Sequence, residues 1–548
     1  MTSGLLRDWR TYRHLRLRQV IGKARLVLMG SRLASGPAPG RRPVSPGRFV
    51  APARRDACVV DGGRFCLLGE TRSLDPHGWD DPAVDLLWRY HLHYFDDLNA
   101  DGADGRTALH EALLSRWVRE NPPGVGTGWE PFPTSRRIVN WITWALRGHR
   151  LSPECVESLA NQARWLYPRL ETNILGNHLL ANAKALAFSG LFFEGAESDA
   201  WMARGLAVLE RELEEQILAH GGHLELSPMY HATVLEDLLD LRNLRNVYGD
   251  AVPPRWASAL DAMMVPVPPM RRWLRAMCHP DGEIGFFNDA ALDVAPAPAD
   301  LDRYARALGF GADDAPLDGV TELSPSGYIR IAGPRLLALL DVARIGPDYL
   351  PAHAHADTLS FECSLDGHRL LVNSGTSCYG SSVERQRQRG TASHNTVVVE
   401  GADSSEVWGG FRVARRARPF ALTVTSGREV VVACAHDGYR RLRGRPVHRR
   451  QWTVSDGALV VEDTVSNPQA SAQARFHIHP DVRIERGPAD GEGRLHLPSG
   501  RRARWIVETG RPSIEPSTWH PRFGTAIPNH CLAIGLVDGS SRVRFDWD

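Results

Sequence analysis

The second half of the chain is best interpreted from one stretch, Pro351-Ala352-His353-Ala354-His355-Ala356-Asp357-Thr358-Leu359-Ser360-Phe361-Glu362. Two histidines and an aspartate lie within five residues, and they lead directly into an alternating pattern typical of a β-strand. Residues i and i+2 of a strand point to the same face, so His353 and His355 are expected to reach one site together. Asn373 and His394 follow, each beside another strand-like run. This set predicts a metal-assisted or proton-transfer site, although surface-strand histidines are common and His-x-His alone is a weak signal.

The region around this stretch is rich in strand-like runs. From about residue 320 onward they recur at 335–342, 396–400, 429–434 and 458–463, with turn signals at 366–367 and 456–457. Asp-Gly pairs between apolar runs are typical of β-hairpins. The pattern predicts an antiparallel β-sandwich domain over residues 316–548.

The preceding region has a helical pattern. Apolar residues recur at three- and four-residue spacing in 155–166, 179–193, 200–218 and 232–247. Short connections that contain Gly, Pro or Asn separate these segments. Paired helices without a clear repeat predict an (α/α) toroid, or an irregular solenoid, over residues 51–315.

Residues 1–50 are strongly basic. Arginines and one lysine alternate with Leu, Val and Ile up to about Met29, and a Pro/Gly/Arg-rich linker follows to about Pro46. This pattern predicts an amphipathic helix that contacts an anionic membrane surface or a partner. The alternative is a solvated helix that packs on its own domain.

Composition excludes several classes of protein. The chain has 548 residues, 43% of them hydrophobic, and a net charge of +1, which gives no electrostatic argument for nucleic-acid binding. The eight cysteines form no Cys-x-x-Cys pair, and no stretch approaches the ~20 apolar residues of a membrane span. The first residues lack the apolar core of a signal peptide. We therefore expect a cytoplasmic location, with an envelope-associated or periplasmic one as the alternative; the oligomeric state stays open.

Two segments of the helical half carry polar residues at helix starts. Asn177 and His178 follow Gly176, where a helix N-terminus favours bound anions. Tyr230 and His231 follow Pro228, on the first turn of another helix. The alternatives are an Asn cap with a structural histidine, and a tyrosine that only packs.

Aromatic residues are concentrated in two other helical segments. On the inner rim of a toroid, aromatic rings would stack on the apolar faces of sugars, whereas core packing is the alternative for each residue. The candidates for sugar contact in these segments are Trp88, Tyr90, His91, Tyr94, Trp129 and Arg137.

These motifs together resemble the heparinase II/III superfamily of polysaccharide lyases. The matching pieces occur in the family's order and run from about residue 80 to the end: 176–178, 227–231, 353–357, 373–375 and 394–396. The resemblance implies a toroid followed by a β-sandwich, with the site in the cleft between them. It also implies cleavage of uronic-acid polysaccharides by β-elimination.

The resemblance assigns roles to four residues. Asn177 and His178 would bind the uronate carboxylate and offset its charge as the C5 proton leaves. Tyr230 would give a proton to the leaving O4, and could also act as base. His353 would abstract the proton or hold the charge of the tyrosine.

Metal-binding members of the family suggest a further set of residues. By position, His355, Asn373 and His394 would hold zinc, but Asn373 stands where an acidic ligand is usual, and an amide oxygen is a poorer zinc ligand. No organic cofactor is expected. Two further substrate-binding candidates, His231 and Arg389, lie in or beside the matching motifs. The reason for Arg389 is that arginine suits an acidic glycan.

We therefore predict a lyase for an acidic polysaccharide or oligosaccharide, with a role in exopolysaccharide metabolism. The first alternative is a non-catalytic glycan-binding or assembly protein on the same scaffold, which the Asn at position 373 favours. The second is a metal-dependent glycan hydrolase centred on His353, His355 and His394.

Overall fold

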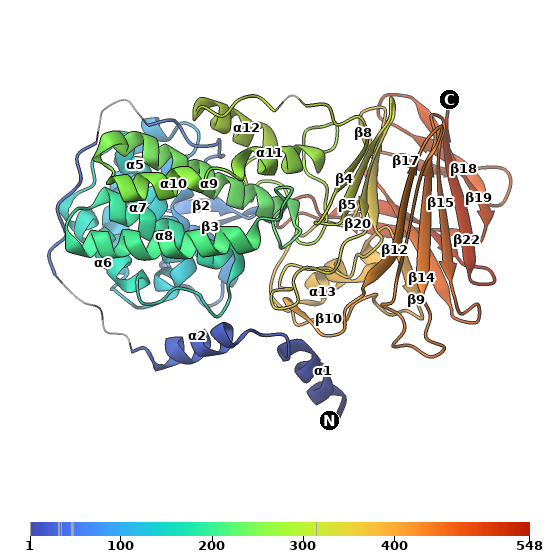
Figure 1. Cartoon of the computed structure of the whole chain (residues 1–548), viewed down its shortest axis with the longest axis horizontal. Helices are drawn as coiled ribbons and strands as arrows, with labels where there is room; N and C mark the ends of the chain where they lie inside the picture. The colour runs from blue at the N-terminus through green and yellow to red at the C-terminus, as the bar shows by residue number, and fades with distance from the viewer. Residues whose placement is uncertain (1, 31–32, 34–35, 45–48, 314) are drawn as a thin grey trace.

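The computed structural model describes residues 2–548 except 31–32, 34–35, 45–48 and 314, so part of the predicted linker lies outside the described residues. Helices gather at one end of the molecule and two large sheets at the other (Figure 1). The order of helices and then antiparallel sheets is the predicted toroid followed by a sandwich.

The helical domain begins with a small three-stranded antiparallel sheet that the sequence pattern did not indicate. Its strands are β1 (Val59–Asp61), β2 (Arg64–Leu67) and β3 (Glu70–Ser73). The helices that follow are α3 (Leu86–Tyr94), α4 (Thr107–Glu120), α5 (Pro131–Leu146), α6 (Pro153–Leu166), α7 (Gly176–Phe192), α8 (Ala196–Gln216), α9 (Pro228–Tyr248), α10 (Pro254–Ala262), α11 (Val267–Ala276) and α12 (Pro298–Ala307).

Helix starts in this domain follow local chemistry. Pro occupies the first turn of α5, α6 and α9, where its missing N–H costs no hydrogen bond. Ser152 and Ser227 cap α6 and α9 by accepting hydrogen bonds from backbone N–H groups of the first turn. Because Ser227 fixes the start of α9, it also fixes where Tyr230 stands.

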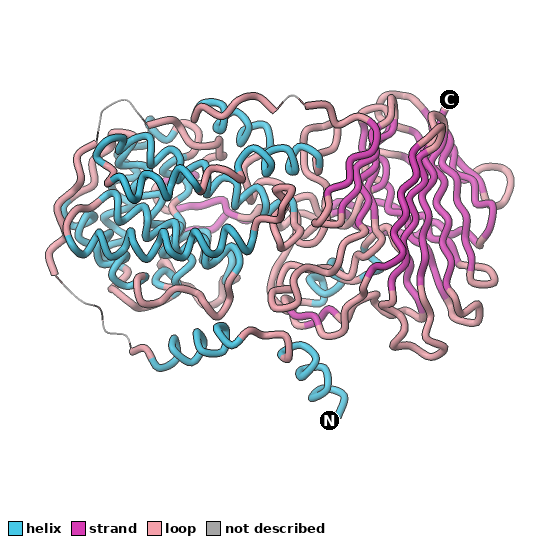
Figure 2. Tube along the Cα trace, in the orientation of Figure 1, coloured by secondary structure: helices cyan, strands magenta, loops and turns pink. Residues whose placement is uncertain are grey.

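The second domain contains two antiparallel sheets (Figure 2). One has the strand order β20-β21-β16-β8-β7-β6-β5-β4, with β9 paired to β16, and the other has the order β12-β13-β14-β15-β22-β19-β18-β17. The strands are β4 (Gly319–Leu323), β5 (Tyr328–Ala332), β6 (Leu336–Asp341), β7 (Phe361–Leu365), β8 (His368–Leu371), β9 (Val397–Val399), β12 (Pro419–Ser426), β13 (Val430–His436), β14 (His448–Val454), β15 (Ala458–Val465), β16 (Ala472–Ile478), β17 (Arg483–Arg486), β18 (Glu492–His496), β19 (Arg502–Thr509), β20 (Arg511–Trp519), β21 (Ile527–Gly535) and β22 (Ser540–Trp547).

Side chains from both sheets form one apolar core. Phe361 of β7 packs edge-on against Trp452 of β14 and near Phe476 of β16, and all three are fully buried. A short ribbon, β10 (Val407–Trp408) with β11 (Arg412–Val413), and helix α13 (Val383–Arg389) lie outside the two sheets, on the side that faces the helical domain. These connections, rather than the sheets themselves, supply the site.

Two helices, and not the single predicted one, form the N-terminal segment. They are α1 (Thr2–Tyr12) and α2 (Leu17–Leu28), and they lie along one side of the molecule below both domains (Figure 1). Within the part of the chain that the structure describes, no helix is long and apolar enough to cross a bilayer.

The predicted H-x-H strand is a loop. β7 begins only at Phe361, and residues 351–360 are an irregular, largely buried segment. The alternation of His and Ala therefore does not reflect a pleat. The two histidines meet one acidic group from different sides, as described next.

Candidate functional site

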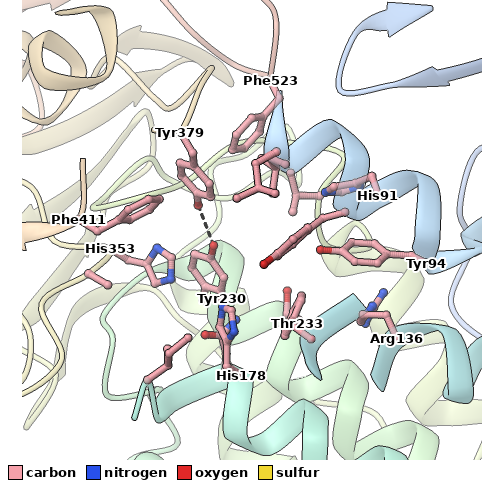
Figure 3. Close-up of a pocket in the computed structure, with 18 of the residues that line it drawn as sticks. His91, Tyr94, Arg136, His178, Tyr230, Thr233, His353, Tyr379, Phe411 and Phe523 are labelled. Atoms are coloured by element: carbon pink, nitrogen blue, oxygen red, sulfur yellow. Dashed lines mark hydrogen bonds between the residues drawn. The ribbon is translucent and has the colours of Figure 1, made fainter. Parts of the chain in front are cut away.

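A cavity of about 470 Å³ lies between the helical domain and the loops of the sandwich. Helices α3, α5, α7 and α9 supply one wall, and sandwich loops supply the other through Leu350, His353, Tyr379, Phe411 and Phe523. Figure 3 shows Tyr230 of the helical wall and His353 of the sandwich wall side by side.

The centre of the cavity is a contact between Tyr230 and His353. Their rings stack with centroids 3.8 Å apart and planes at 30°. The Tyr230 hydroxyl shares a hydrogen bond of 2.7 Å with the hydroxyl of Tyr379, which comes from the other domain (Figure 3). A histidine and two phenols thus meet at one point of the cavity.

Asp289 holds His353 in place from behind. One carboxylate oxygen of this buried residue is 2.9 Å from Nδ1 of His353, and the other is 2.8 Å from Nε2 of His355. A carboxylate only accepts hydrogen bonds, so both ring nitrogens donate. His353 consequently carries a proton on Nδ1, and its Nε2 lies 3.5 Å from Oε2 of Glu225.

Arg385 keeps Asp289 charged. Its guanidinium donates to both carboxylate oxygens, through Nη1 to Oδ1 and through Nη2 to Oδ2 at 2.7 Å. Burial favours a raised pKa for Asp289, but the charge of Arg385 and the hydrogen bonds from the two histidines outweigh it, and the pKa lies well below its ordinary value. The orienting acid is therefore ionised at neutral pH.

The two phenols stay protonated. Burial is the main cause that raises the pKa of Tyr230 well above 10, and the charge of Asp289 adds to it. The pKa of Tyr379 is raised in the same way, by burial first and then by Asp289. Both hydroxyls therefore carry their protons at neutral pH and can act as proton donors but not as bases.

The start of α7 supplies a second polar cluster. The Asn177 side chain lines the cavity and has no hydrogen-bond partner among the described residues. His178 lies with its ring against Phe132 and with Nδ1 3.1 Å from Glu171. Burial lowers the pKa of His178, but Glu171 outweighs it, so the pKa is raised and the ring favours its cationic form.

Glu225 joins the two clusters. Its Oε1 accepts a hydrogen bond of 3.2 Å from the backbone N–H of Asn177, and its Oε2 lies 3.5 Å from Nε2 of His353. The predicted anion position at the start of α7 is thus already used by a protein carboxylate. The Asn177 and His178 side chains, not the helix end, face the cavity.

Residues at the starts of α7 and α9 have positive φ angles. Leu175 and Leu226, which precede α7 and Ser227, have φ values of 73° and 59°. Gly176 has φ 57°, and a Cβ there would meet Glu225 Oε1 and Leu350 Cδ2 at 2.6 Å. Left-handed leucines cost about 1–3 kcal/mol each and gather at functional sites. Only glycine allows Glu225 to approach α7 this closely.

Comparisons with known proteins identify the family of the chain. A family model described as "Heparinase II/III-like, C-terminal" matches residues 315–542, and one described as "Heparinase II/III N-terminus" matches residues 111–305. The chain belongs to the heparinase II/III-like family.

Two relatives from the curated proteins illustrate the range of this family. FtsZ-localized protein C of Caulobacter vibrioides is 27% identical over 456 residues, covering 78% of this chain and 74% of the relative. Heparin-sulfate lyase of Bacteroides stercoris is 23% identical over 385 residues, covering 64% of this chain and 54% of that lyase. The chain thus matches only about half the length of that lyase.

Solved structures show the same fold. A crystal structure of heparinase III superposes with a TM-score of 0.68 at 17% identity, covering 86% of this chain and 80% of the other. Chondroitin AC lyase of Streptomyces coelicolor gives 0.54 at 13% identity, covering 90% of this chain and 77% of the other. The likeness is one of fold.

Seven predicted site residues line the cavity of this heparinase-like chain. Four are the predicted catalytic residues, and three are predicted sugar contacts on one face of α3, at i, i+1 and i+4. They are Asn177, His178, Tyr230, His353, Tyr90, His91 and Tyr94.

Three predicted sugar contacts belong to the core of the helical domain instead. Trp88 is on the opposite face of α3 and donates to the carbonyl of Glu70, while Trp129 packs against Trp117 and Trp165. Arg137 is fully buried, stacks on Trp117 and donates to Gly128 and Gln162. Trp88 and Arg137 face the core because a helix has two faces, and the neighbouring Arg136 is the one that faces the cavity. Trp129 lies in a short 3-10 turn before α5 and is buried there.

The two remaining predicted contacts are also structural. His231 is buried one residue beyond Tyr230, with Nε2 2.9 Å from the carbonyl of Met270. Arg389 is buried and donates to the carbonyl of Ala354, which shapes the loop that carries His353. Arg385, four residues earlier on α13, is the arginine that acts on the site.

The predicted metal ligands do not fit a metal ion. Asn373 uses its amide to donate to Phe286 and to accept from Asn395, and His355 uses both ring nitrogens on Asp289 and His394. Among the described residues, no group of three His, Cys, Asp or Glu side chains is placed to hold a metal.

Sequence reasoning missed Asp289, Glu225 and Tyr379. Asp289 lies in a Phe-Phe-Asn-Asp-Ala segment between α11 and α12 with no motif of its own, and Tyr379 stands alone in a loop. Glu225 lies two residues before the Ser-Pro-Met-Tyr-His motif, which was the one available signal. Their roles arise from contacts between domains, which no local pattern encodes.

Proposed function

We propose that the chain is a polysaccharide lyase that cleaves a uronate-containing glycan by β-elimination in the cavity between its domains. The observation that supports this most strongly is that a protonated phenol, an oriented imidazole and a free carboxamide line one cavity. The family of the chain and its lyase relatives support it further.

In this mechanism Nε2 of His353 takes the C5 proton of the uronate. The electron pair of the C5–H bond forms the C4=C5 double bond, the C4–O4 bond breaks, and the Tyr230 hydroxyl gives its proton to O4. Asp289 stabilises the imidazolium through Nδ1, and Glu225 lies beside Nε2. Tyr379 orients the Tyr230 hydroxyl through their shared hydrogen bond.

Asn177 and His178 bind the uronate carboxylate in this proposal. Negative charge on that group grows as the C5 proton leaves, so a neutral amide donor and a cationic imidazole stabilise the transition state more than the ground state. The Asn177 amide is free for this role, and Glu171 favours the charged form of His178.

The charges of the cavity favour a glycan with few sulfate groups. The lining residues in the described part of the chain include two arginines and no lysine. Arg55 donates at 2.5 Å to Glu236, and Arg136 lies 3.4 Å from Asp96. Burial lowers the pKa of His91 to about 4, which leaves it neutral. Since sulfates are recognised by unpaired cations, a polymer of unsulfated uronates fits this wall better.

A panel of glycans tests the proposal. We expect alginate, unsulfated heparosan or hyaluronan to yield the ultraviolet absorbance of a conjugated C4=C5 uronate, and heparin to react more slowly. Products with saturated ends would indicate a hydrolase, and the absence of any product across the panel would contradict the lyase assignment. Faster reaction with heparin would contradict the low-sulfate assignment alone.

A non-catalytic assembly role is the second candidate. It is favoured by the match to FtsZ-localized protein C, which covers 74% of that relative, against 54% of the Bacteroides stercoris lyase. This role predicts glycan binding by calorimetry without a product for every polymer in the panel.

A further inference from the structure

The N-terminal helices present their apolar side to solvent. Half of the exposed large hydrophobic side chains among the described residues lie between Leu5 and Leu28, about a twentieth of the chain. Scattered single exposed apolar residues are normal, but a contiguous group marks an interaction surface. The exposed group comprises Leu5, Leu6, Trp9, Tyr12, Leu15, Leu17, Val20, Ile21, Val27 and Leu28.

Helix α2 is amphipathic, but its apolar face points to solvent and its polar face points to the protein. Leu17, Val20, Ile21 and Leu28 share one helical face, and their side chains are between 53% and 85% exposed. The opposite face, with Gln19 and Gly22, is buried against the protein. A helix that only covers its own domain would turn the apolar face inward.

Polar contacts fix this orientation. Arg18 pairs with Glu212 and Glu215 of α8, and Gln19 donates to the carbonyl of Tyr349. Gly22 fits against the backbone at Thr172, where a Cβ would lie 2.4 Å from the threonine hydroxyl. α2 is therefore held by its polar side.

Helix α1 continues the same arrangement on the second domain. Thr11 is buried and accepts a hydrogen bond of 3.1 Å from Trp408 of β10, and Arg7 stacks on the same indole. Leu5, Leu6 and Trp9 lie on the other side and are exposed. The two helices run along both domains (Figure 1), and we call their exposed apolar side chains the apolar strip.

The strip has basic borders. Seven basic residues and one acidic residue lie between residues 2 and 28, whereas the whole chain has a net charge of +1, so the remainder is net negative. Arg10, Arg13, Lys23 and Arg25 have no carboxylate partner within the described ranges. An apolar face bordered by unpaired cations, with a tryptophan in it, complements an anionic lipid surface.

We propose that α1 and α2 bind the protein to the surface of an anionic bilayer, lying in the interface without crossing it. Cosedimentation of the full chain tests this with vesicles of phosphatidylcholine alone or mixed with phosphatidylglycerol. We expect binding to the mixed vesicles that weakens as salt is raised, since surface charge is screened. Equal binding to both vesicle types, or to neither, would overturn the proposal.

Substitutions in α2 test whether the apolar strip is the surface that contacts the lipid. Leu17→Glu with Ile21→Glu is expected to weaken binding about tenfold or more, and Lys23→Glu with Arg25→Glu to have a similar effect. The matched control, Val265→Glu with Val383→Glu, changes side chains that are 76% and 88% exposed elsewhere and should bind as wild type. Unfolding temperatures of all variants should agree, because the replaced side chains are exposed.

Light scattering tests the alternative that a second copy of the chain, and not a lipid surface, covers the apolar strip. A dimer of the full chain that dissociates in the Leu17→Glu, Ile21→Glu variant would assign the strip to a second copy of the chain and overturn the lipid proposal. Vesicle binding that survives in both N-terminal variants would place the lipid contact elsewhere and would also overturn it.

Discussion

Tyr230 is the residue whose side chain has the clearest expected effect. Tyr230→Phe removes the proton donor for O4, and loss of one general acid lowers turnover by about 10²–10⁴. The ring and its stacking on His353 stay, so the unfolding temperature should change little. Turnover on a glycan that the wild type cleaves is the measurement, with Tyr167→Phe, a tyrosine outside the cavity lining, as the control. Activity within threefold of wild type would exclude the acid role.

Asn373 gives a second residue-scale prediction. Asn373→Asp is expected to lower the free energy of unfolding by about 1–3 kcal/mol, because the carboxylate cannot donate to the Phe286 carbonyl and would face it unpaired. It should not create a zinc site. Thermal unfolding and elemental analysis of the purified variant check both parts, and stoichiometric zinc with raised stability would contradict this account.

At the scale of residues, the sequence predicted which types of residue matter better than the direction in which each side chain points. Tyr230, His353, Asn177 and His178 each stand in a short motif, and all four line the cavity. Arg136 and Arg137 are adjacent and chemically identical, and only helix packing decides that the first faces the cavity and the second the core. The same applies to Arg385 and Arg389, which are both buried but contact different groups.

At the scale of elements, the start of α7 is the most sensitive connection. Gly176→Ala is expected to lower turnover about tenfold or more, because a Cβ at 2.6 Å pushes Glu225 and Leu350 away and shifts Asn177 and His178. The left-handed backbone adds a cost of about 1–2 kcal/mol in stability.

Gly78→Ala is the matched control for this variant. Gly78 has φ 75° and no atom within 4 Å of a built Cβ, so the substitution carries the backbone cost alone. We expect a similar loss of unfolding temperature with wild-type turnover. Equal turnover in both variants would show that Glu225 does not position the start of α7.

Most helices and strands could be predicted because periodicity, proline and Asp-Gly turns are local signals. Helices α6 to α9 and the hairpins at 366–367 and 456–457 lie where the pattern placed them. The alternating pattern predicts a strand at 351–360, but the segment is a loop in which His353 and His355 contact Asp289 and Ala354 and Ala356 are buried. The break between α1 and α2 also lacks a Pro or Gly to mark it.

At the scale of the whole molecule, one buried ion pair links the two domains and predicts acid sensitivity. The folded pKa of Asp289 is depressed, so its contribution to stability is present above the unfolded pKa of about 4 and is lost as pH falls below that value. The free energy of unfolding should therefore decline at acid pH.

Asp289→Asn should make that acid decline less steep. It should also lower stability at neutral pH by about 3–5 kcal/mol, because Arg385 would be left buried without its counter-charge. Asp75→Asn removes a solvent-exposed pair with Arg116 and serves as the control, with a smaller effect. Chemical unfolding at a series of pH values measures both variants, and an unchanged acid decline in Asp289→Asn would contradict the prediction.

The position of Asp289 also limits how the two domains can change in evolution. The carboxylate comes from the segment between α11 and α12, whereas the imidazoles and the guanidinium that it holds come from the sandwich loops and α13. A recombination event between two genes, joined near residues 308–318, would unite an acid with partners selected for a different acid. The two halves are therefore expected to pass through evolution as one unit, with changes at position 289 accompanied by changes at 353, 355 and 385.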